Sequence, residues 1–111
     1  MSRGLGDVYK RQNKNKLNPN QNLTIGTISG FNRQKNPILF AKTALLVSAI
    51  YPEANFKIAA DIPSFDNKYY RKFKDILKGS NCKMKIMGFL EDIPSYLNSL
   101  DIFLYTSEWE G

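Results

Sequence analysis

Two loops of the chain hold residues whose types and spacing suit the binding of a phosphorylated ligand. The first, Ser29–Asn36, carries Arg33 and Lys35 directly before a predicted helix start, where free amides and the positive helix end attract anions. The second, Thr106–Gly111, combines two hydroxyls, two carboxylates, a tryptophan and a glycine, and its carboxylates could accept hydrogen bonds from sugar or ribose hydroxyls. Taken one at a time, each loop is explained more simply as a solvent-exposed turn.

Glycine spacing and composition exclude several kinds of site. Gly26 and Gly30 follow the pattern G-x-x-x-G, which is neither the dinucleotide-binding G-x-G-x-x-G nor a phosphate loop ending in Gly-Lys-Ser/Thr. The chain has 111 residues, no His and one Cys, which excludes the usual zinc sites, Ser-His and Cys-His catalytic pairs, and an internal disulfide. We therefore expect no metal and a cytoplasmic location, with the chemistry carried by carboxylates, cations, hydroxyls and backbone amides.

The positive charge is concentrated in the first third of the chain. The net charge is +6, and residues 1–36 hold seven bases and one acid, whereas residues 37–111 hold nine of each. We interpret residues 1–22 as a basic disordered leader, and residues 1–12 within it as a translation artefact, because Asp7–Gln12 resembles translated sequencing-adapter DNA. A nucleic-acid-binding arm is the alternative, but Tyr9 is the only aromatic residue there that could stack on a base, so no nucleic-acid partner is expected.

Residues 23–111 alternate between strand-like and helix-like patterns. The first helix is predicted to begin at Asn36-Pro37, because Asn can cap a helix and Pro suits its first position, and to end near Ile50, before Pro52. Four strands are predicted at Leu23–Ser29, Asn55–Ala60, Lys83–Gly88 and Asp101–Tyr105, and two further helices at Asp66–Lys78 and Ile93–Leu100.

This β-α-β-α-β-α-β order predicts an α/β fold with a Rossmann-like parallel sheet and right-handed crossovers. The usual strand order for such a half-sheet is 3-2-1-4, which brings the loops after the first and fourth strands together at the ligand-binding edge. In that order the apolar fourth strand, Ile102–Tyr105, would be an exposed edge. We therefore expect a further strand beside it, beyond residue 111, and interpret the chain as cut at both ends.

Four segments, in the right order and spacing, resemble the C-terminal, nucleotide-sugar-binding domain of family 4 glycosyltransferases. Residues 25–37 read Ile-Gly-Thr-Ile-Ser-x-Phe-x-x-Gln-Lys-Asn-Pro, and Asp101–Gly111 ends in Ser-x-x-Glu-Gly. Phe56–Asp61 and Met84–Phe89 match the strands between them and the turns that follow.

The resemblance implies a function. These enzymes have two domains, in the arrangement called GT-B, and move a sugar from a nucleotide-sugar donor to an acceptor hydroxyl with retention at the anomeric carbon. Residues 23–111 would then be a partial donor-binding domain for a UDP- or GDP-sugar, without a metal and without the acceptor-binding domain. The fragment is expected to be inactive alone, and contact of the whole protein with a membrane is compatible with the family.

The resemblance also implies roles for the residues of the first loop. Lys35 occupies the place of a lysine that contacts the donor diphosphate, where a cation stabilises the charge on the departing nucleotide. Most members carry an arginine five residues before this lysine, but Gly30 stands there in this chain. Arg33 is the nearby cation that could replace it.

In the second loop, Glu110 is the expected catalytic residue, close to the donor sugar, with Ser107 and Gly111 in the same loop. The nucleobase is expected at the turn around Gly88 and Phe89. A second glutamate of the family pattern E-x7-E would fall beyond the last residue.

A non-catalytic α/β module that binds nucleotides or protein partners remains the alternative function. A module of the signalling-receiver type would need acids at the end of the first strand, and residues 26–29, Gly-Thr-Ile-Ser, supply none.

Overall fold

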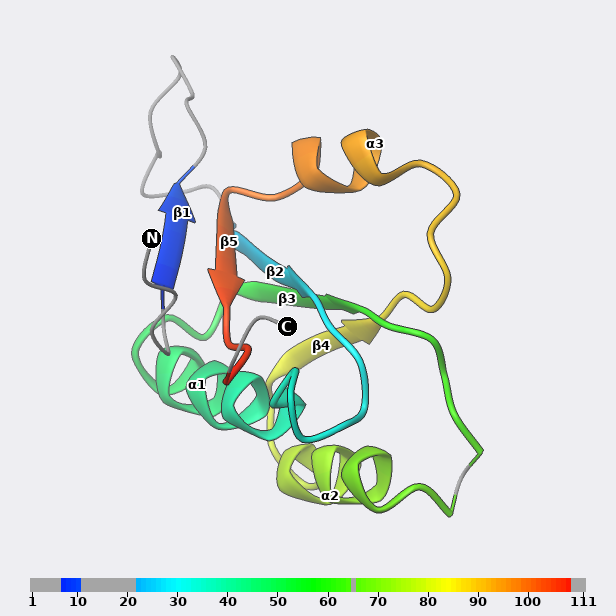
Figure 1. Cartoon of the computed structure of the whole chain (residues 1–111). Coiled ribbons are helices and arrows are strands. Elements are labelled where there is room, and N and C mark those ends of the chain that lie inside the picture. The colour runs from blue at the N-terminus through cyan, green and yellow to red at the C-terminus, as the bar shows by residue number, and fades with distance from the viewer. Residues whose placement is uncertain (1–6, 11–21, 65, 109–111) are drawn as a thin grey trace.

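Strands and helices alternate along the chain from Thr24 to Tyr105, as the sequence predicts (Figure 1). The computed structural model describes residues 7–10, 22–64 and 66–108, and for residues 7–10 the backbone alone. The elements are β1 (Asp7–Lys10), β2 (Thr24–Ile28), α1 (Pro37–Ile50), β3 (Asn55–Ala59), α2 (Lys68–Leu77), β4 (Lys83–Ile86), α3 (Ile93–Asn98) and β5 (Ile102–Tyr105).

The sheet has the strand order β1-β5-β2-β3-β4. Strands β2, β3, β4 and β5 are parallel, and they correspond to the predicted first, second, third and fourth strands. The predicted order 3-2-1-4 and the α/β fold class are therefore confirmed. β5 lies beside β2, with Ile25 opposite Ile102 and Gly26 opposite Phe103, so the loops after these two strands leave the same edge of the sheet.

The outer edge of β5 is occupied by β1, which pairs with it in antiparallel fashion from Asp7 opposite Tyr105 to Lys10 opposite Ile102. The sequence predicts a disordered leader at residues 7–10 and a strand from beyond residue 111 at this edge. The structure instead places a strand of residues 7–10 there. The physical reason is the unpaired edge of an apolar strand, which offers a row of free amides and carbonyls to any extended segment nearby. The remainder of the predicted leader lies outside the described residues, apart from Asn22.

α1 begins and ends where its sequence signals place it. The Oδ1 of Asn36 accepts a 3.1 Å hydrogen bond from the amide of Leu39, and Pro37 occupies the first turn. Asn36 has a φ of 51°, in the left-handed region that asparagine tolerates better than most residues. The helix ends at Ile50, and the amide of Tyr51 closes the last turn on the carbonyl of Val47.

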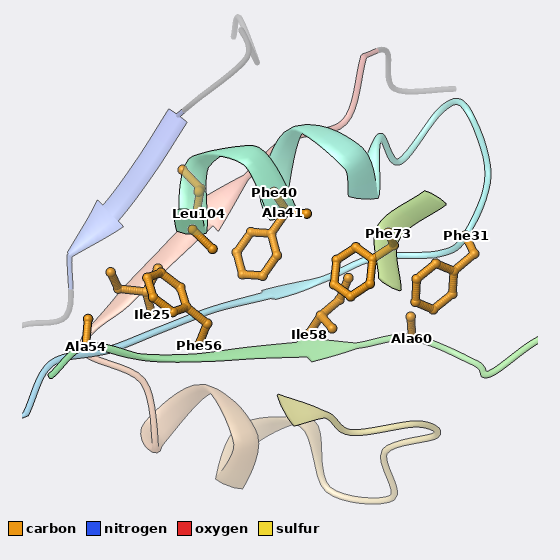
Figure 2. Close-up of a cluster of buried hydrophobic side chains, with 11 residues drawn as sticks. Ile25, Phe31, Phe40, Ala41, Ala54, Phe56, Ile58, Ala60, Phe73 and Leu104 are labelled. Carbon is orange, nitrogen blue, oxygen red and sulfur yellow. The ribbon is translucent and has the colours of Figure 1, made fainter. Parts of the chain in front are cut away.

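The main core lies between the sheet and the two helices α1 and α2, which cover the same face (Figure 1). Figure 2 shows Phe40 of α1 above Phe56 of β3, where the two rings make an edge-to-face contact at 6.4 Å between centroids. The buried members of this cluster are Ile25, Phe31, Phe40, Ala41, Ala44, Ala54, Phe56, Ile58, Ala60, Phe73 and Leu104.

α3 covers the opposite face of the sheet with a smaller cluster around Tyr96, Leu100 and Ala59. The hydroxyl of Tyr96 donates to the backbone carbonyl of Thr27 at 2.7 Å and lies 3.2 Å from that of Lys57. Burial raises the pKa of the Tyr96 phenol to about 12, because the charged phenolate is disfavoured away from water. Gly26 lies directly beneath, and a Cβ there would stand 2.6 Å from Leu100 Cδ2, so a side chain at that position would push Leu100 or Tyr96 out of place.

Candidate functional site

The loop after β2 and the segment after β5 meet, as the strand order predicts. The amide of Glu108 donates a 2.7 Å hydrogen bond to the carbonyl of Gln34, and the hydroxyl of Thr106 donates to the carbonyl of Lys35 at 3.1 Å. These contacts join residues about 70 positions apart in the sequence. Two segments that are unremarkable alone therefore form one surface at the carboxyl edge of the sheet.

The first loop is held by Phe31, whose side chain is 6% exposed. Its ring packs edge-to-face against Tyr70 at 5.0 Å and Phe73 at 5.4 Å, both in α2. The side-chain amide of Asn67, which also caps α2, donates to the carbonyl of Phe31 at 3.3 Å. The loop is thus anchored to α2, while its polar residues 32–36 remain at the surface or half-buried.

The two cations of the first loop differ in setting. The side chain of Arg33 is 74% exposed, and its Nε lies 3.6 Å from Oε1 of Glu108. Such an exposed pair contributes little to stability, so Glu108 competes only weakly with another anion for Arg33. Lys35 is half-buried, and both its backbone groups are hydrogen-bonded. Its amide donates to Oδ1 of Asn32 at 2.9 Å, and its carbonyl accepts from the hydroxyl of Thr106.

The start of α1 supplies fewer free amides to an anion than its position beside the loop suggests. Pro37 has no amide proton, and the amide of Leu39 is taken by the side chain of Asn36. The attraction for an anion at this loop therefore rests mainly on the charges of Lys35 and Arg33, with a smaller part from the helix dipole.

Gly30 has no structural need to be a glycine in this loop. Its φ lies outside the left-handed region, and a Cβ would approach Nδ2 of Asn32 at 2.9 Å. Asn32 is exposed, but its Oδ1 accepts the hydrogen bond from the Lys35 amide, so moving this side chain would disturb that bond. The nearest contacts of a side chain at position 30 would be other side chains and not backbone, so they present no rigid obstacle.

In the second segment, Thr106 is 2% exposed and Ser107 is 3% exposed. Ser107 therefore contributes to the position of the segment more than to its open surface. Glu108 is exposed and stands beside Arg33. The predicted catalytic Glu110 and the neighbouring Gly111 lie outside the described residues.

A pocket of about 200 Å³ opens at the carboxyl ends of β2, β3 and β4. The predicted base-binding turn lies in its wall: Gly88 has a φ of +75°, which glycine adopts without strain, and Phe89 is 79% exposed. The volume is below the roughly 300 Å³ at which pockets for whole drug-sized ligands begin, so it suits one ring or a similar part of a ligand. The remaining lining residues are Ile28, Ser29, Ala59, Ala60, Asp61, Leu90 and Ile93.

Most of these pocket residues were not among the predicted site residues. Ser29 links the pocket to the Arg33–Lys35 loop, and Asp61 places an exposed carboxylate on its rim. Their positions in the sequence could have identified them as site residues, since each is the first or second residue after a parallel strand. The structure thus brings the predicted base-binding turn and the predicted diphosphate loop to the same edge of the sheet.

Within the residues that the structure describes, no group of three or more His, Cys, Asp or Glu side chains lies close enough to hold a metal ion. No helix in that part of the chain is both long and apolar enough to cross a membrane.

The comparison with known proteins gives one informative similarity. The chain is 30% identical over 80 residues to the UDP-Gal:alpha-D-GlcNAc-diphosphoundecaprenol alpha-1,3-galactosyltransferase of Escherichia coli. The matched region is 70% of this chain and 20% of that enzyme, so the chain spans about a fifth of the length of the curated relative it matches. No protein-family profile and no solved structure matches the chain. Part of this α/β chain is therefore similar to a glycosyltransferase.

Proposed function

We propose that the chain is part of a retaining glycosyltransferase of the GT-B type, family 4, and that it carries part of the site for the nucleotide-sugar donor. The observation that carries the proposal is the meeting of the two polar loops, through the 2.7 Å hydrogen bond from the Glu108 amide to the Gln34 carbonyl. It brings the predicted diphosphate loop against the segment that leads to Glu110. Similarity to a galactosyltransferase supports the same reading.

In this proposal Lys35 contacts the donor diphosphate. Transfer of the sugar leaves negative charge on the departing nucleoside diphosphate, and a fixed ammonium group stabilises that charge more in the transition state than in the bound donor. Arg33 adds a second cation at the exposed side of the loop. The nucleobase enters the pocket at Gly88 and Phe89, Glu110 approaches the donor sugar, and no metal is needed.

The name of the relative suggests which nucleotide to test first. That enzyme uses UDP-galactose and transfers to a GlcNAc carried on diphosphoundecaprenol. We propose a UDP-sugar as donor for this chain, with a GDP-sugar as the alternative. The whole protein would carry an acceptor-binding domain, act in the cytoplasm, and meet a membrane surface where its acceptor is a similar polyprenyl lipid.

Titration of the 111-residue chain with UDP, GDP and inorganic diphosphate, followed by calorimetry or by amide chemical shifts, tests this proposal. We expect weak binding of UDP, with a Kd of about 1 mM, tighter than that of inorganic diphosphate because the base adds contact. Lys35→Ala should weaken UDP binding about fivefold. Lys72→Ala removes an equal charge from the exposed face of α2 and should leave binding unchanged.

Three results would count against the proposal. Equal losses in Lys35→Ala and Lys72→Ala would show that binding follows net charge alone. Absence of binding at 10 times the expected Kd, about 10 mM, would remove the donor site from this chain. Turnover of a nucleotide sugar by the chain alone would contradict the assignment of further catalytic groups to a missing domain.

A further inference from the structure

The free edge of β4 and the groove beside it form a second surface, separate from the candidate donor site. β4 (Lys83–Ile86) is the last strand of the sheet order, and within the described residues no strand pairs with its outer side. Figure 1 shows β4 with α2 alongside, at the edge opposite to β1. A groove of about 460 Å³ lies between α2 and this strand.

The side chains of the groove are mostly apolar, and they are incompletely covered. Phe73 is fully buried at its base, whereas Leu77, Met84 and Ile86 are half-buried. Met84 and Ile86 point to the α2 side of the sheet, because both pack against the main core. Lys74 and Lys78 of α2, with Asp75 between them, complete the lining of the groove.

The backbone of β4 also directs hydrogen-bonding groups toward the outer edge of the sheet, beside the groove. The amide of Met87 donates to the carbonyl of Ile58 in β3 at 2.8 Å, so it points into the sheet. Amide directions alternate along a strand, and the backbone groups of Met84 and Ile86 therefore face the outer edge. These are the two residues whose side chains border the groove.

The two lysines of β4 decide which kind of strand can pair there. Lys83 and Lys85 are exposed and, by alternation, project on the face opposite to the groove. Lys83 Nζ already lies 3.0 Å from Oε1 of Glu53, in an ion pair whose two side chains are both exposed. Lys85 also lies directly opposite Lys57 on β3, so this face already holds two like charges side by side. A second copy of β4 would add further lysines to this row, and lysines on an edge strand are a common means by which proteins prevent such self-pairing.

We propose that the β4 edge binds an extended peptide segment of a partner protein in which apolar and acidic residues alternate. The apolar side chains would enter the groove beside Met84 and Ile86. The acidic ones would lie opposite Lys85 and opposite Lys83, where they would replace the exposed ion pair with Glu53. Backbone hydrogen bonds to the edge supply affinity, and the alternation supplies specificity, as in other cases of strand addition.

The test uses the 111-residue chain and a capped, fluorescently labelled octapeptide in which glutamate and valine alternate. Anisotropy should show saturable binding of this peptide, and a peptide with lysine in place of each glutamate should bind at least tenfold more weakly. Lys85→Glu should weaken binding of the glutamate peptide about fivefold and strengthen that of the lysine peptide. Lys72→Glu, the same charge change on the far side of α2, is the matched control and should alter neither.

Circular dichroism of both variants confirms that they fold, and Lys85→Gln gives a milder change at the same position should Lys85→Glu be unstable. Equal binding of the two peptides, equal effects of the Lys85 and Lys72 variants, or no binding at all would overturn the proposal. A concentration-dependent dimer in sedimentation that Lys85→Glu abolishes or strengthens would also overturn it, because the edge would then belong to a second copy of the chain.

Discussion

The hydroxyl of Tyr96 in α3 donates a 2.7 Å hydrogen bond to the backbone carbonyl of Thr27 in β2, beneath the helix and out of contact with solvent. The same hydroxyl lies 3.2 Å from the carbonyl of Lys57 in β3. A single side chain thus ties the short third helix to two adjacent strands of the sheet.

Replacement of Tyr96 by phenylalanine should lower the free energy of unfolding at neutral pH by about 1 kcal/mol, because the hydrogen bond is lost while the ring still fills its site. Urea denaturation followed by circular dichroism measures this change. Tyr51→Phe serves as a control, since Tyr51 is 60% exposed and should tolerate the loss of its hydroxyl. An equal effect of the two variants would show that the buried hydrogen bond contributes nothing.

Tyr96 also predicts a dependence of stability on alkaline pH. Its pKa is raised to about 12 from an ordinary 10.0, so the folded state holds the phenolic proton more tightly than the unfolded state. The stabilisation is complete below pH 10 and is lost as the pH rises from 10 toward 12. Denaturation at pH 9 and at pH 11 should therefore show a larger loss in the unmodified chain than in Tyr96→Phe, and parallel losses would contradict the prediction.

Gly26→Ala should be destabilising by about 2 kcal/mol, because a methyl group would overlap Leu100 and the Tyr96 hydroxyl in a packed layer. Gly30→Ala provides the matched comparison. There the methyl group meets the exposed side chain of Asn32 and not a packed layer, and the free energy of unfolding should change by less than about 0.5 kcal/mol. Thermal unfolding of the two variants in parallel distinguishes a packing requirement from a general intolerance of glycine replacement.

Gly30→Arg should increase the affinity for UDP, because it places a guanidinium where the resembled family carries one and where the structure shows no rigid obstacle. We expect a gain of about threefold to tenfold in titrations at low ionic strength. Asn81→Arg adds the same charge at an exposed position before β4 and should give no comparable gain. A similar gain in both variants would indicate non-specific attraction of the anion.

The sequence predicted the parallel sheet well because its signals are local. Asn36-Pro37 and Pro52 bracket α1, and Gly79 follows α2 with a φ of +78°. Element ends differed by one or two residues, as at α2, which begins at Lys68 after Asn67 caps it. The exposed edge of β5 follows from the strand order, but its pairing with β1 could not be predicted in this way, because it joins segments at opposite ends of the chain.

The same distinction applies to the candidate site. That the loops after β2 and β5 meet follows from strand order, and the structure bears it out through Glu108 and Gln34. The exposed pairing of Arg33 with Glu108 and the occupation of the Leu39 amide by Asn36 depend on loop geometry. No periodic pattern in the sequence encodes such geometry, so the sequence alone could not predict these details.

The anchoring of Phe31 has a consequence for how ligand binding would be detected. Asn67 caps α2 through the amides of Tyr69 and Tyr70, and the same side chain donates to the Phe31 carbonyl. Fraying at the start of α2 and loosening of the cation-bearing loop are therefore thermodynamically linked, and the linkage is reciprocal. A ligand held by that loop should slow hydrogen exchange at the first amides of α2, a remote readout that requires no probe at the site itself.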